Sequence, residues 1–332
     1  MDDEFKQQIL ATLERIENRL TQLERDQSLL RRANARARAV ARRIWLRPPM
    51  WTFEQYLPRV LDLNAFPPAP ELPADIPRIA IVTPSYNHAR YLDATIDSIL
   101  AQNYPNLHYH VQDAGSADGT VELLKARGDR INWRSARDNG QSHAINLGFD
   151  GVESDIMAYL NSDDMLLPGT LAYVVNFFRD HPDVDIVYGH RVFIDRDGHE
   201  VGRAVFPAHH DKTLKYADYI PQETMFWRRR VWQALKSIDE SFHYAMDWDF
   251  ILRAQDFGFR FARLPRFLAC FRVHDEQKTA ATYDVGALEM QALRLRCLGF
   301  VPSQVQIRRA VAPYVVRQLA FHWGYKLGLL KY

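Results

Sequence analysis

Short apolar runs alternate with amphipathic segments from Arg78 onward, a pattern that predicts a layered α/β domain. Ile79–Val82 is an apolar run of strand length, and the segment from Tyr91 to Ile99 then carries apolar residues at helical spacing. Strands that alternate with helices form a mostly parallel sheet, and ligands bind beyond the carboxyl ends of such strands. Strands are expected at 79–82, 107–111, 131–133, 155–160 and 184–188, with helices at 91–99, 120–127, 142–149 and from Pro168 onward.

The pattern after residue 188 is less regular. The apolar run Val192–Ile194 followed by the turn Asp197–Gly198 predicts a β-hairpin. Between Ile307 and Tyr332 the chain has five basic and no acidic residues, and its apolar positions allow either a helix that covers the domain or one that lies on a membrane surface. These apolar positions are Val315, Leu319, Phe321, Trp323 and Leu327. Further helices are expected at 246–254 and 285–298, and a further strand at 267–273.

The first 47 residues predict one long helix with two different halves. An apolar heptad seam fits either a coiled coil that joins copies of the chain into a homo-oligomer or an amphipathic helix packed on its own domain. From Arg31 to Arg47 the chain has seven arginines and no acid, which fits either a solvated helix face or attraction to an anionic membrane surface. The seam residues are Ile9, Leu13, Ile16, Leu20, Leu23, Gln27 and Leu30.

Residues 48–77 form a linker by composition, because proline interrupts regular elements. Four apolar residues are expected to hold part of this linker on the domain surface, namely Trp51, Phe53, Tyr56 and Leu57. The prolines are Pro48, Pro49, Pro58, Pro67, Pro68, Pro70, Pro73 and Pro77. The expected organisation is a helical segment at 1–47, the linker at 48–77, an α/β domain at 78–280 and a helical C-terminal region at 281–332.

Composition places the chain among ordinary globular proteins. Hydrophobic residues make up 47% and charged residues 25% of the 332 residues, which excludes disordered and collagen-like chains. The 42 Lys and Arg nearly balance the 41 Asp and Glu, which argues against a dedicated nucleic-acid binder. Cys270 and Cys297 are too few for a disulfide framework or a thiolate zinc site. The N-terminus lacks the apolar core of a secretory signal, and no run of about 18 apolar residues occurs. The sequence therefore predicts a cytoplasmic protein, with peripheral contact at the inner face of the cell membrane through its basic ends.

Asp163–Asp164 is the sharpest candidate for chemistry, because two carboxylates follow a predicted strand at the end where ligands bind. Mg²⁺ and Mn²⁺ prefer oxygen ligands and are held by one or two carboxylates together with substrate phosphates. The alternative is structural, since Asp164 also suits the cap of the helix that opens near Pro168. Missing motifs exclude other enzyme classes: no G-x-G-x-x-G follows the first strand, and no P-loop or G-x-S-x-G elbow occurs.

Seven motifs, in this order along the chain, resemble those of the family 2 glycosyltransferases. The resemblance covers residues 78–280 and implies a GT-A fold, an α/β architecture with a mostly parallel sheet flanked by helices. It also implies that a sugar is transferred with inversion from a nucleotide-activated donor, expected to be a UDP-sugar, to a hydroxyl group of a glycan or lipid-linked saccharide. The motifs are Ile81–Asn87, Gln112–Thr120, Asp138–Asn146, Tyr159–Asp164, Ile220–Thr224, Met246–Arg253 and Phe271–His274.

The matched positions imply roles for individual residues. Asp247 corresponds to the general base, and Asp164 and His274 would bind Mn²⁺ or Mg²⁺. A carboxylate base removes the proton of a weakly nucleophilic hydroxyl, and a metal ion stabilises the diphosphate leaving group. The resemblance implies donor binding by Thr83, Pro84, Tyr86, Asp113, Asp138, Gln141 and Asp163, with Asp113 on the uracil base, and an acceptor side formed by Gln222, Glu223 and Trp248.

Structural alternatives stay open at several of these positions. Asp247 also suits a helix cap, Asp113 a turn and Trp248 a buried core, and His274 also suits a surface position after a strand. Two other functions are weighed against the transferase. One is a sugar nucleotidyltransferase, whose Gly-rich basic signature after the first strand is absent here. The other is a catalytically silent scaffold that oligomerises through its N-terminal helix.

Overall fold

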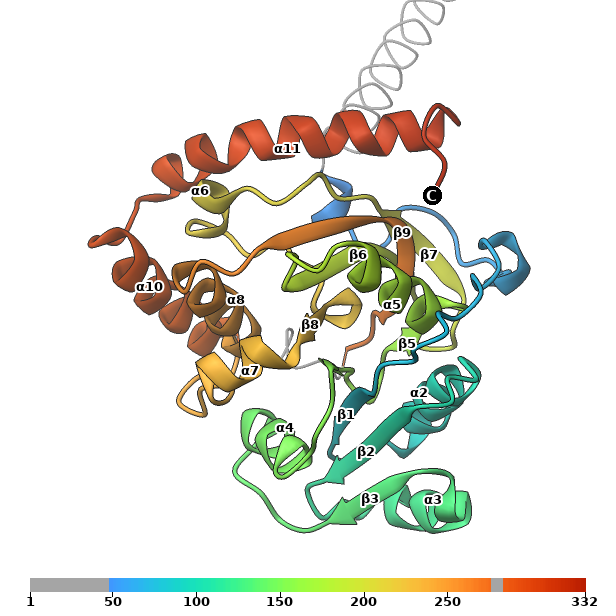
Figure 1. Ribbon diagram of the computed structural model, residues 1–332. Helices are drawn as coiled ribbons and strands as arrows, with labels where there is room; N and C mark the ends of the chain where they lie inside the picture. Colours follow the sequence, from blue (N-terminus) through green and yellow to red (C-terminus); the bar gives the residue numbers. More distant parts are fainter. Residues whose placement is uncertain (1–47, 276–282) are drawn as a thin grey trace, which may run out of the picture. The chain divides into compact units, whose positions relative to one another are not determined.

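The computed structural model describes residues 48–275 and 283–332, and Pro48–Tyr332 form one compact unit (Figure 1). The predictions for residues 1–47, the coiled coil and the arginine-rich half of the helix, lie outside the described residues. Within the described ranges, nine strands form one sheet with helices on both faces.

The strands are β1 (Ile79–Ser85), β2 (Leu107–Asp113), β3 (Asn132–Ser135), β4 (Ile156–Tyr159), β5 (Met165–Leu166), β6 (Ile186–Ile194), β7 (Glu200–Ala204), β8 (Phe226–Arg228) and β9 (Phe261–Arg272). The α-helices are α2 (Ala89–Leu100), α3 (Thr120–Arg127), α4 (Gln141–Phe149), α5 (Thr170–Asp180), α6 (Asp211–Leu214), α7 (Arg229–Leu235), α8 (Met246–Asp256), α10 (Tyr283–Leu298) and α11 (Gln304–Lys326). Short 3₁₀ helices are η1 (Pro49–Trp51), η2 (Leu63–Ala65), η3 (Gly128–Arg130) and η4 (Gln222–Thr224).

β1 is apolar along its length because the sheet is covered on both faces. Ile79 and Ile81 belong to the core cluster that includes residues of α2, whereas Ala80 and Val82 belong to the cluster on the α4 side. A strand that is buried on both faces carries a continuous apolar run instead of an alternating one. Gly148 on α4 permits the close approach, since a Cβ at this position would lie 2.5 Å from Cγ1 of Val82.

The strand order is β3-β2-β1-β4-β8-β6-β9-β5, and β7 pairs with β6. β1 is parallel to β2 and β4, and β2 is parallel to β3, so the predicted parallel pairing is confirmed for this half. In the other half β8 is antiparallel to β4 and β6, while β6 and β9 are parallel, so the complete sheet is mixed. β6 and β7 form the predicted hairpin. The strands β5 and β8 are too short for a periodic pattern, and the sequence did not predict them.

The proline-rich linker is anchored on β7 by backbone pairing and by one buried carboxylate. Arg59 and Glu200 exchange backbone hydrogen bonds of 3.0 and 2.7 Å. Glu200 is 1% exposed, and its carboxylate accepts hydrogen bonds from the Tyr56 hydroxyl and the Arg59 guanidinium. Phe53 packs on aromatic rings of β6 and β9. The expected surface contacts are thus confirmed for Phe53 and Tyr56, whereas that of Leu57 is wrong, because this side chain is 88% exposed.

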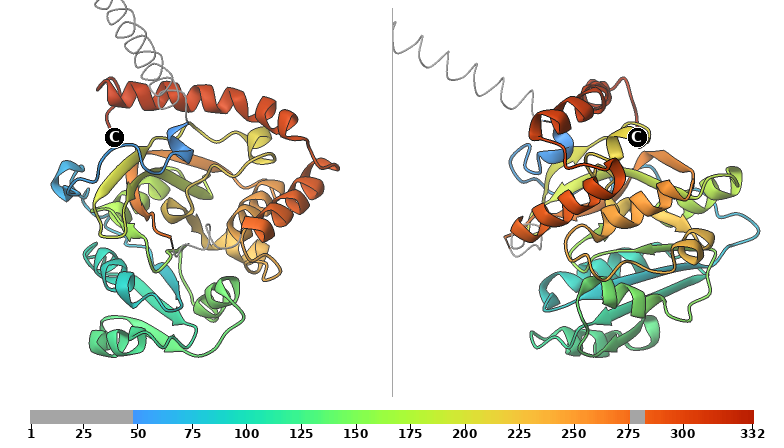
Figure 2. Two further views of the ribbon diagram at one scale, coloured as in Figure 1. Left: turned by 180° about the vertical axis from the view of Figure 1, so that it is seen from behind. Right: turned by 90° about the vertical axis from the view of Figure 1, so that its left-hand side faces the viewer.

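α11 lies at the outside of the unit, at the end opposite α3 and β3 (Figure 2). Its inward side chains pack on the domain, and the Gln318 amide donates a hydrogen bond of 3.0 Å to the backbone oxygen of Val205. The interpretation as a helix that covers the domain is therefore confirmed for the inward side of α11. Val315 and Leu319 are half-buried, whereas Leu327 is 69% exposed. The buried residues of α11 are Val311, Tyr314, Gln318 and His322.

In the described ranges, no helix combines the length and the apolar content that crossing a bilayer requires.

Candidate active site

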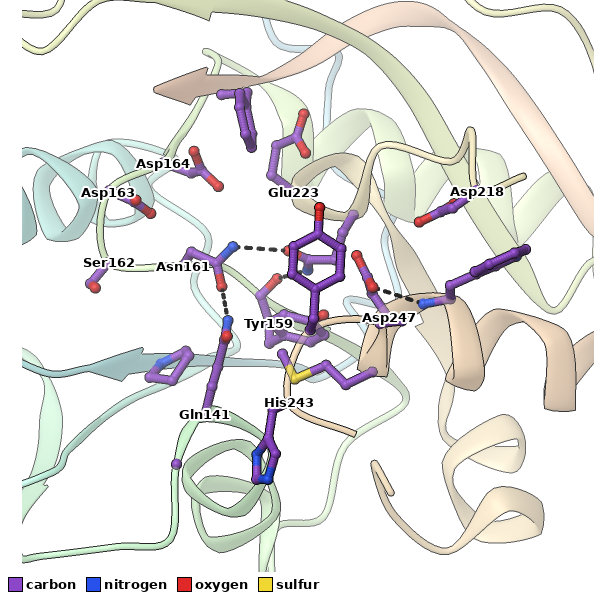
Figure 3. Close-up of a pocket in the computed structure, with 18 of the residues that line it drawn as sticks. Gln141, Tyr159, Asn161, Ser162, Asp163, Asp164, Asp218, Glu223, His243 and Asp247 are labelled. Carbon is purple, nitrogen blue, oxygen red and sulfur yellow. Dashed lines mark hydrogen bonds between the residues drawn. The ribbon is translucent and has the colours of Figure 1, made fainter. Parts of the chain in front are cut away.

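A cavity of about 1180 Å³ lies beyond the carboxyl ends of β1 and β4 (Figure 3). Its walls include Pro84–Tyr86 at the end of β1, Asn161–Asp164 after β4, Gln222 and Glu223 of η4, and Asp247 at the start of α8. The carboxyl ends of the strands are where the sequence placed the ligand site. The volume exceeds the roughly 300–1,000 Å³ of typical small-molecule pockets, so the cavity has room for more than one reactant.

Asp163 and Asp164 form a nearly buried carboxylate pair, with exposures of 8% and 1%. Arg272 holds this segment from β9: its backbone N–H donates to Oδ1 of Asp164 (3.0 Å), and its Nε donates to the backbone oxygen of Asp163 (2.8 Å). Burial, together with the charges of Asp163 and Glu223, raises the pKa of the Asp164 carboxyl well above its usual range. A positive charge bound at this point would therefore stabilise the carboxylate form.

The donor atoms of this pair fit a hard divalent cation, because adjacent carboxylate oxygens are the ligands that Mg²⁺ and Mn²⁺ prefer. In the part of the chain that the structure describes, no three His, Cys, Asp or Glu side chains are grouped as a metal site. Water and a substrate phosphate would have to complete the coordination. His274 contacts Asp163 and not Asp164: its Nε2 lies 3.0 Å from Oδ2 of Asp163, and its buried Nδ1 has no hydrogen-bond partner among the described residues.

Asp247 stands in the first turn of α8, and its Oδ1 accepts a hydrogen bond of 2.8 Å from the backbone N–H of Trp248. Figure 3 shows Asp218 on the same side of the cavity. Burial and the charge of Asp247 raise the pKa of the Asp218 carboxyl well above its usual range. The sequence analysis missed Asp218, although it lies only two residues before Ile220, where the nearest motif starts.

Three side-chain amides form a chain across the cavity wall (Figure 3). Gln141 donates to Oδ1 of Asn161 (2.7 Å), Asn161 donates to Oε1 of Gln222 (3.4 Å), and Gln222 donates to the backbone oxygen of Tyr159 (2.8 Å). Asn161 and Gln222 each accept one hydrogen bond and donate another, so the orientation of each amide group is fixed by its neighbours. The chain links Gln141, predicted on the donor side, with Gln222, predicted on the acceptor side.

Glu223 is buried at 3% exposure and forms a two-point ion pair with Arg191 of β6. The Nε–Oε1 distance is 2.7 Å and the Nη2–Oε2 distance is 2.8 Å. Burial raises the pKa of Glu223, and the charge of Arg191 opposes that shift. Arg191 lies within a strand and outside the motifs, so the sequence analysis gave no signal for it.

The remaining predicted donor-side residues divide into two groups. Pro84, Tyr86 and Asp138 line the cavity, and Tyr86 is 62% exposed. One oxygen of Asp138 accepts a hydrogen bond from the backbone N–H of Gly140 (2.8 Å), whereas Oδ2 has no partner among the described residues. These three residues are therefore positioned to contact a ligand.

Thr83 and Asp113 are not among the cavity-lining residues. The Thr83 hydroxyl accepts a hydrogen bond of 3.2 Å from the Tyr109 hydroxyl. Asp113 is fully buried, and its carboxylate accepts hydrogen bonds from the backbone and hydroxyl of Ser116 and from the hydroxyl of Ser135. In this conformation Asp113 stabilises the turn after β2, and the donor-binding roles of both residues stay predictions.

Two tryptophans border the cavity in different ways. Trp248 is 1% exposed, and its indole N–H donates to the backbone oxygen of Leu214 (2.9 Å), so its ring belongs to the core. Trp51 is 45% exposed and lines the cavity together with Met50 and Phe53. These three residues come from the linker, which the sequence analysis placed outside the α/β domain.

Known proteins share this sequence pattern. The family model described as Glycosyl transferase family 2 matches residues 80–245. An uncharacterized glycosyltransferase of Rickettsia typhi is 27% identical over 225 residues, which cover 61% of this chain and 66% of that protein. The match thus spans slightly less than two thirds of that relative's length.

Solved structures share the fold. S. aureus TarS 1-349 in complex with UDP-GlcNAc superposes with a TM-score of 0.54 at 17% identity, over 75% of each chain. The mannosyltransferase PcManGT from Pyrobaculum calidifontis, in complex with GDP-Man and Mn²⁺, gives a TM-score of 0.54 at 19% identity, over 78% of this chain and 77% of that chain. Both likenesses confirm the predicted α/β fold with its sheet flanked by helices.

Proposed function

The chain belongs to glycosyltransferase family 2 and has the GT-A type of fold, and on that premise we propose that it transfers a sugar, with inversion, from a nucleotide sugar to a hydroxyl group. One observation carries this proposal: Asp163, Asp164 and Asp247 line a single cavity at the carboxyl ends of the parallel strands. The acceptor is a glycan or a lipid-linked saccharide. This choice rests on the family resemblance.

The donor occupies the half of the cavity beside β1 and the start of α4. Pro84 and Tyr86 offer apolar surface to a nucleoside, and Asp138 and Gln141 offer polar atoms to the sugar or the diphosphate. The family resemblance favours a UDP-sugar. TarS was solved with UDP-GlcNAc and PcManGT with GDP-Man, so both nucleotides belong in the test.

Asp247 is the general base that takes the proton of the acceptor hydroxyl as the bond to the anomeric carbon forms. Attack from the face opposite the departing diphosphate inverts the anomeric centre in one displacement. Asp218, Glu223 and Arg191 line the acceptor side of the cavity. The ion pair between Glu223 and Arg191 holds η4 against β6. Met50, Trp51 and Phe53 from the linker add apolar surface to the cavity wall.

Mn²⁺ or Mg²⁺ is the cofactor of this proposal. Asp164 and Asp163 would hold the ion, and His274 would orient Asp163 through its Nε2. A bound cation supplies Lewis-acid stabilisation of the charge that develops on the leaving diphosphate. The raised pKa of the Asp164 carboxyl and the open neighbouring cavity support this assignment.

Assembly and localisation rest on the sequence of the first 47 residues. The seam between Ile9 and Leu30 supports a homo-oligomer, and the seven arginines of 31–47 support peripheral attachment at the cytoplasmic face of the membrane.

The decisive experiment incubates the full chain with UDP- and GDP-sugars and Mn²⁺, with and without chelator, and measures release of the nucleoside diphosphate. We expect slow, Mn²⁺-dependent hydrolysis of one donor, with a product sugar of inverted anomeric configuration by NMR. Pyrophosphorolysis, in which added pyrophosphate converts the nucleotide sugar into nucleoside triphosphate and sugar 1-phosphate, would favour a nucleotidyltransferase. Absence of both nucleotide binding and turnover would favour the silent scaffold.

A further inference from the structure

α11 carries apolar residues on its outward side as well as on the side that packs on the domain, and the described residues cover only the inner side. Its outward residues recur at spacings of three and four, which places them on one side of the helix. Val305, Val316 and Leu327 on this side are 56%, 65% and 69% exposed. We call the following exposed residues the outer stripe: Val305, Ala312, Pro313, Val316, Ala320 and Leu327. Contiguous exposed apolar residues mark a candidate interaction surface, so the outer stripe is a candidate contact for a partner.

Basic side chains border the outer stripe. Arg308 and Lys326 lie along one edge by helical position, Arg317 lies along the other, and Arg309 falls within the stripe. All four are exposed, and the chain has no acidic residue after Glu289. An apolar stripe flanked by Lys and Arg is the arrangement of helices that lie in the interface of an anionic membrane.

We propose that the outward face of α11 is a docking surface for an anionic lipid bilayer, with the outer stripe at the acyl boundary and the arginines at the lipid phosphates. The proposal goes beyond the glycosyl transfer itself, which does not require this face. η1 packs against α11, and Pro48, just before η1, directly follows the arginine-rich segment that ends at Arg47. Two weak basic and apolar signals on one chain give firmer attachment than either one alone.

Charge argues against two other occupants of this face. A second copy docked through the same face would place Arg308, Arg309 and Arg317 against their own counterparts. The arginine-rich segment 31–47 of the same chain would likewise oppose positive charge with positive charge. An anionic surface is the partner whose charge complements both basic stretches at once.

The first test measures flotation of the full chain with vesicles of phosphatidylcholine and with vesicles of an equal mixture of phosphatidylcholine and phosphatidylglycerol. The triple variant Arg308→Gln, Arg309→Gln, Arg317→Gln is expected to bind the mixed vesicles more weakly, by about fivefold for each arginine removed. The matched control removes three exposed basic residues at the opposite end of the unit, with Lys125→Gln, Arg130→Gln and Arg134→Gln. Equal binding of the two triple variants would overturn the proposal.

The second test reports directly on the outer stripe. A polarity-sensitive fluorophore is attached to Val316→Cys in a Cys297→Ser background, in which the remaining Cys270 is fully buried. We expect water-like emission in buffer and a blue shift with the mixed vesicles alone. A blue shift in buffer would show that residues 1–47 or a second copy cover the outer stripe. No shift with the mixed vesicles would show that the outer stripe does not contact the membrane. Either result would overturn the proposal. Donor hydrolysis by the same variants tests the enzymatic proposal separately and is expected to be unchanged.

Discussion

The imidazole of His274 lies 3.0 Å from the carboxylate of Asp163, although 111 residues separate them in the sequence. β9 ends two residues before His274 and also delivers the Arg272 backbone N–H that donates to Asp164. The orientation of the carboxylate pair after β4 therefore depends on the last motif of the domain. This long-range contact makes the proposed metal site sensitive to substitutions that are remote in sequence.

Replacing His274 by Ala is expected to weaken Mn²⁺-dependent binding of the nucleoside diphosphate by about 10- to 100-fold, because the contact that orients Asp163 is lost. Calorimetric titration of UDP and GDP with and without Mn²⁺ measures this effect. Asp164→Asn is expected to abolish the Mn²⁺ dependence while the metal-free affinity stays the same. An unchanged Mn²⁺ dependence in both variants would contradict the metal assignment.

Asp247→Asn is expected to keep donor affinity and to lower the rate of sugar transfer by about 10²- to 10⁴-fold, the range of general-base catalysis. The amide still accepts the hydrogen bond from the Trp248 backbone, so the start of α8 is preserved. Nucleotide titration and product release on the same preparation separate the two effects. If donor affinity fell as much as the rate, Asp247 would have to be reassigned to donor binding.

Asp249, one half-turn further along α8, serves as the structural counterpart. It is fully buried, and its two oxygens lie 2.7 Å from Nε of Arg253 and 2.5 Å from Nη1 of Arg296. Asp249→Ala is expected to lower the free energy of unfolding by about 1–3 kcal/mol, because it leaves two half-buried guanidinium groups without their shared partner. Urea unfolding checks this value, and Asp247→Asn, which keeps the hydrogen bond from the Trp248 backbone, should be nearly neutral in the same assay. Equal stability losses would remove the distinction between the two carboxylates.

His322 makes the packing of α11 sensitive to acid. Burial, followed by the charge of Lys326, lowers the pKa of His322 from 6.5 to about 4. The unfolded chain therefore binds the proton first as the pH falls, so the contribution of the neutral side chain to stability is complete above pH 6.5 and is lost toward pH 4. The loss amounts to roughly 3 kcal/mol at most. Unfolding free energies measured across this range should fall less steeply for His322→Gln, and parallel curves would refute the assignment.

The first half of the sheet was predictable because its central strands are covered on both faces and their apolar runs are continuous. The second half was less predictable, since β8 has three residues and the pairing of β6 with β9 joins segments that lie far apart in the sequence. No local pattern encodes such a pairing. The family resemblance nevertheless singled out Asp163, Asp164 and Asp247, and all three line one cavity.

The sequence was less informative about the partners of individual side chains. The sequence predicted an aspartate at the end of β2. Only the folded turn shows that the hydroxyls of Ser116 and Ser135 donate hydrogen bonds to the Asp113 carboxylate. Likewise, the tryptophan beside the proposed base is buried by Leu214 and its neighbours, whereas Trp51 reaches the cavity from a segment with no periodic pattern. Exposure of an aromatic ring is a property of its tertiary neighbours and not of its motif.

Met50, Trp51 and Phe53 form part of the cavity wall, yet they precede by about thirty residues the first position that the family model matches. A recombinant fragment trimmed to the matched region would lack part of the cavity wall and would expose Phe193 of β6 and Phe271 of β9, on which Phe53 packs. Chimeras that exchange modules between relatives face the same difficulty if they are joined at the first strand. A fragment designed for protein engineering should therefore begin no later than Pro48, where the compact unit starts.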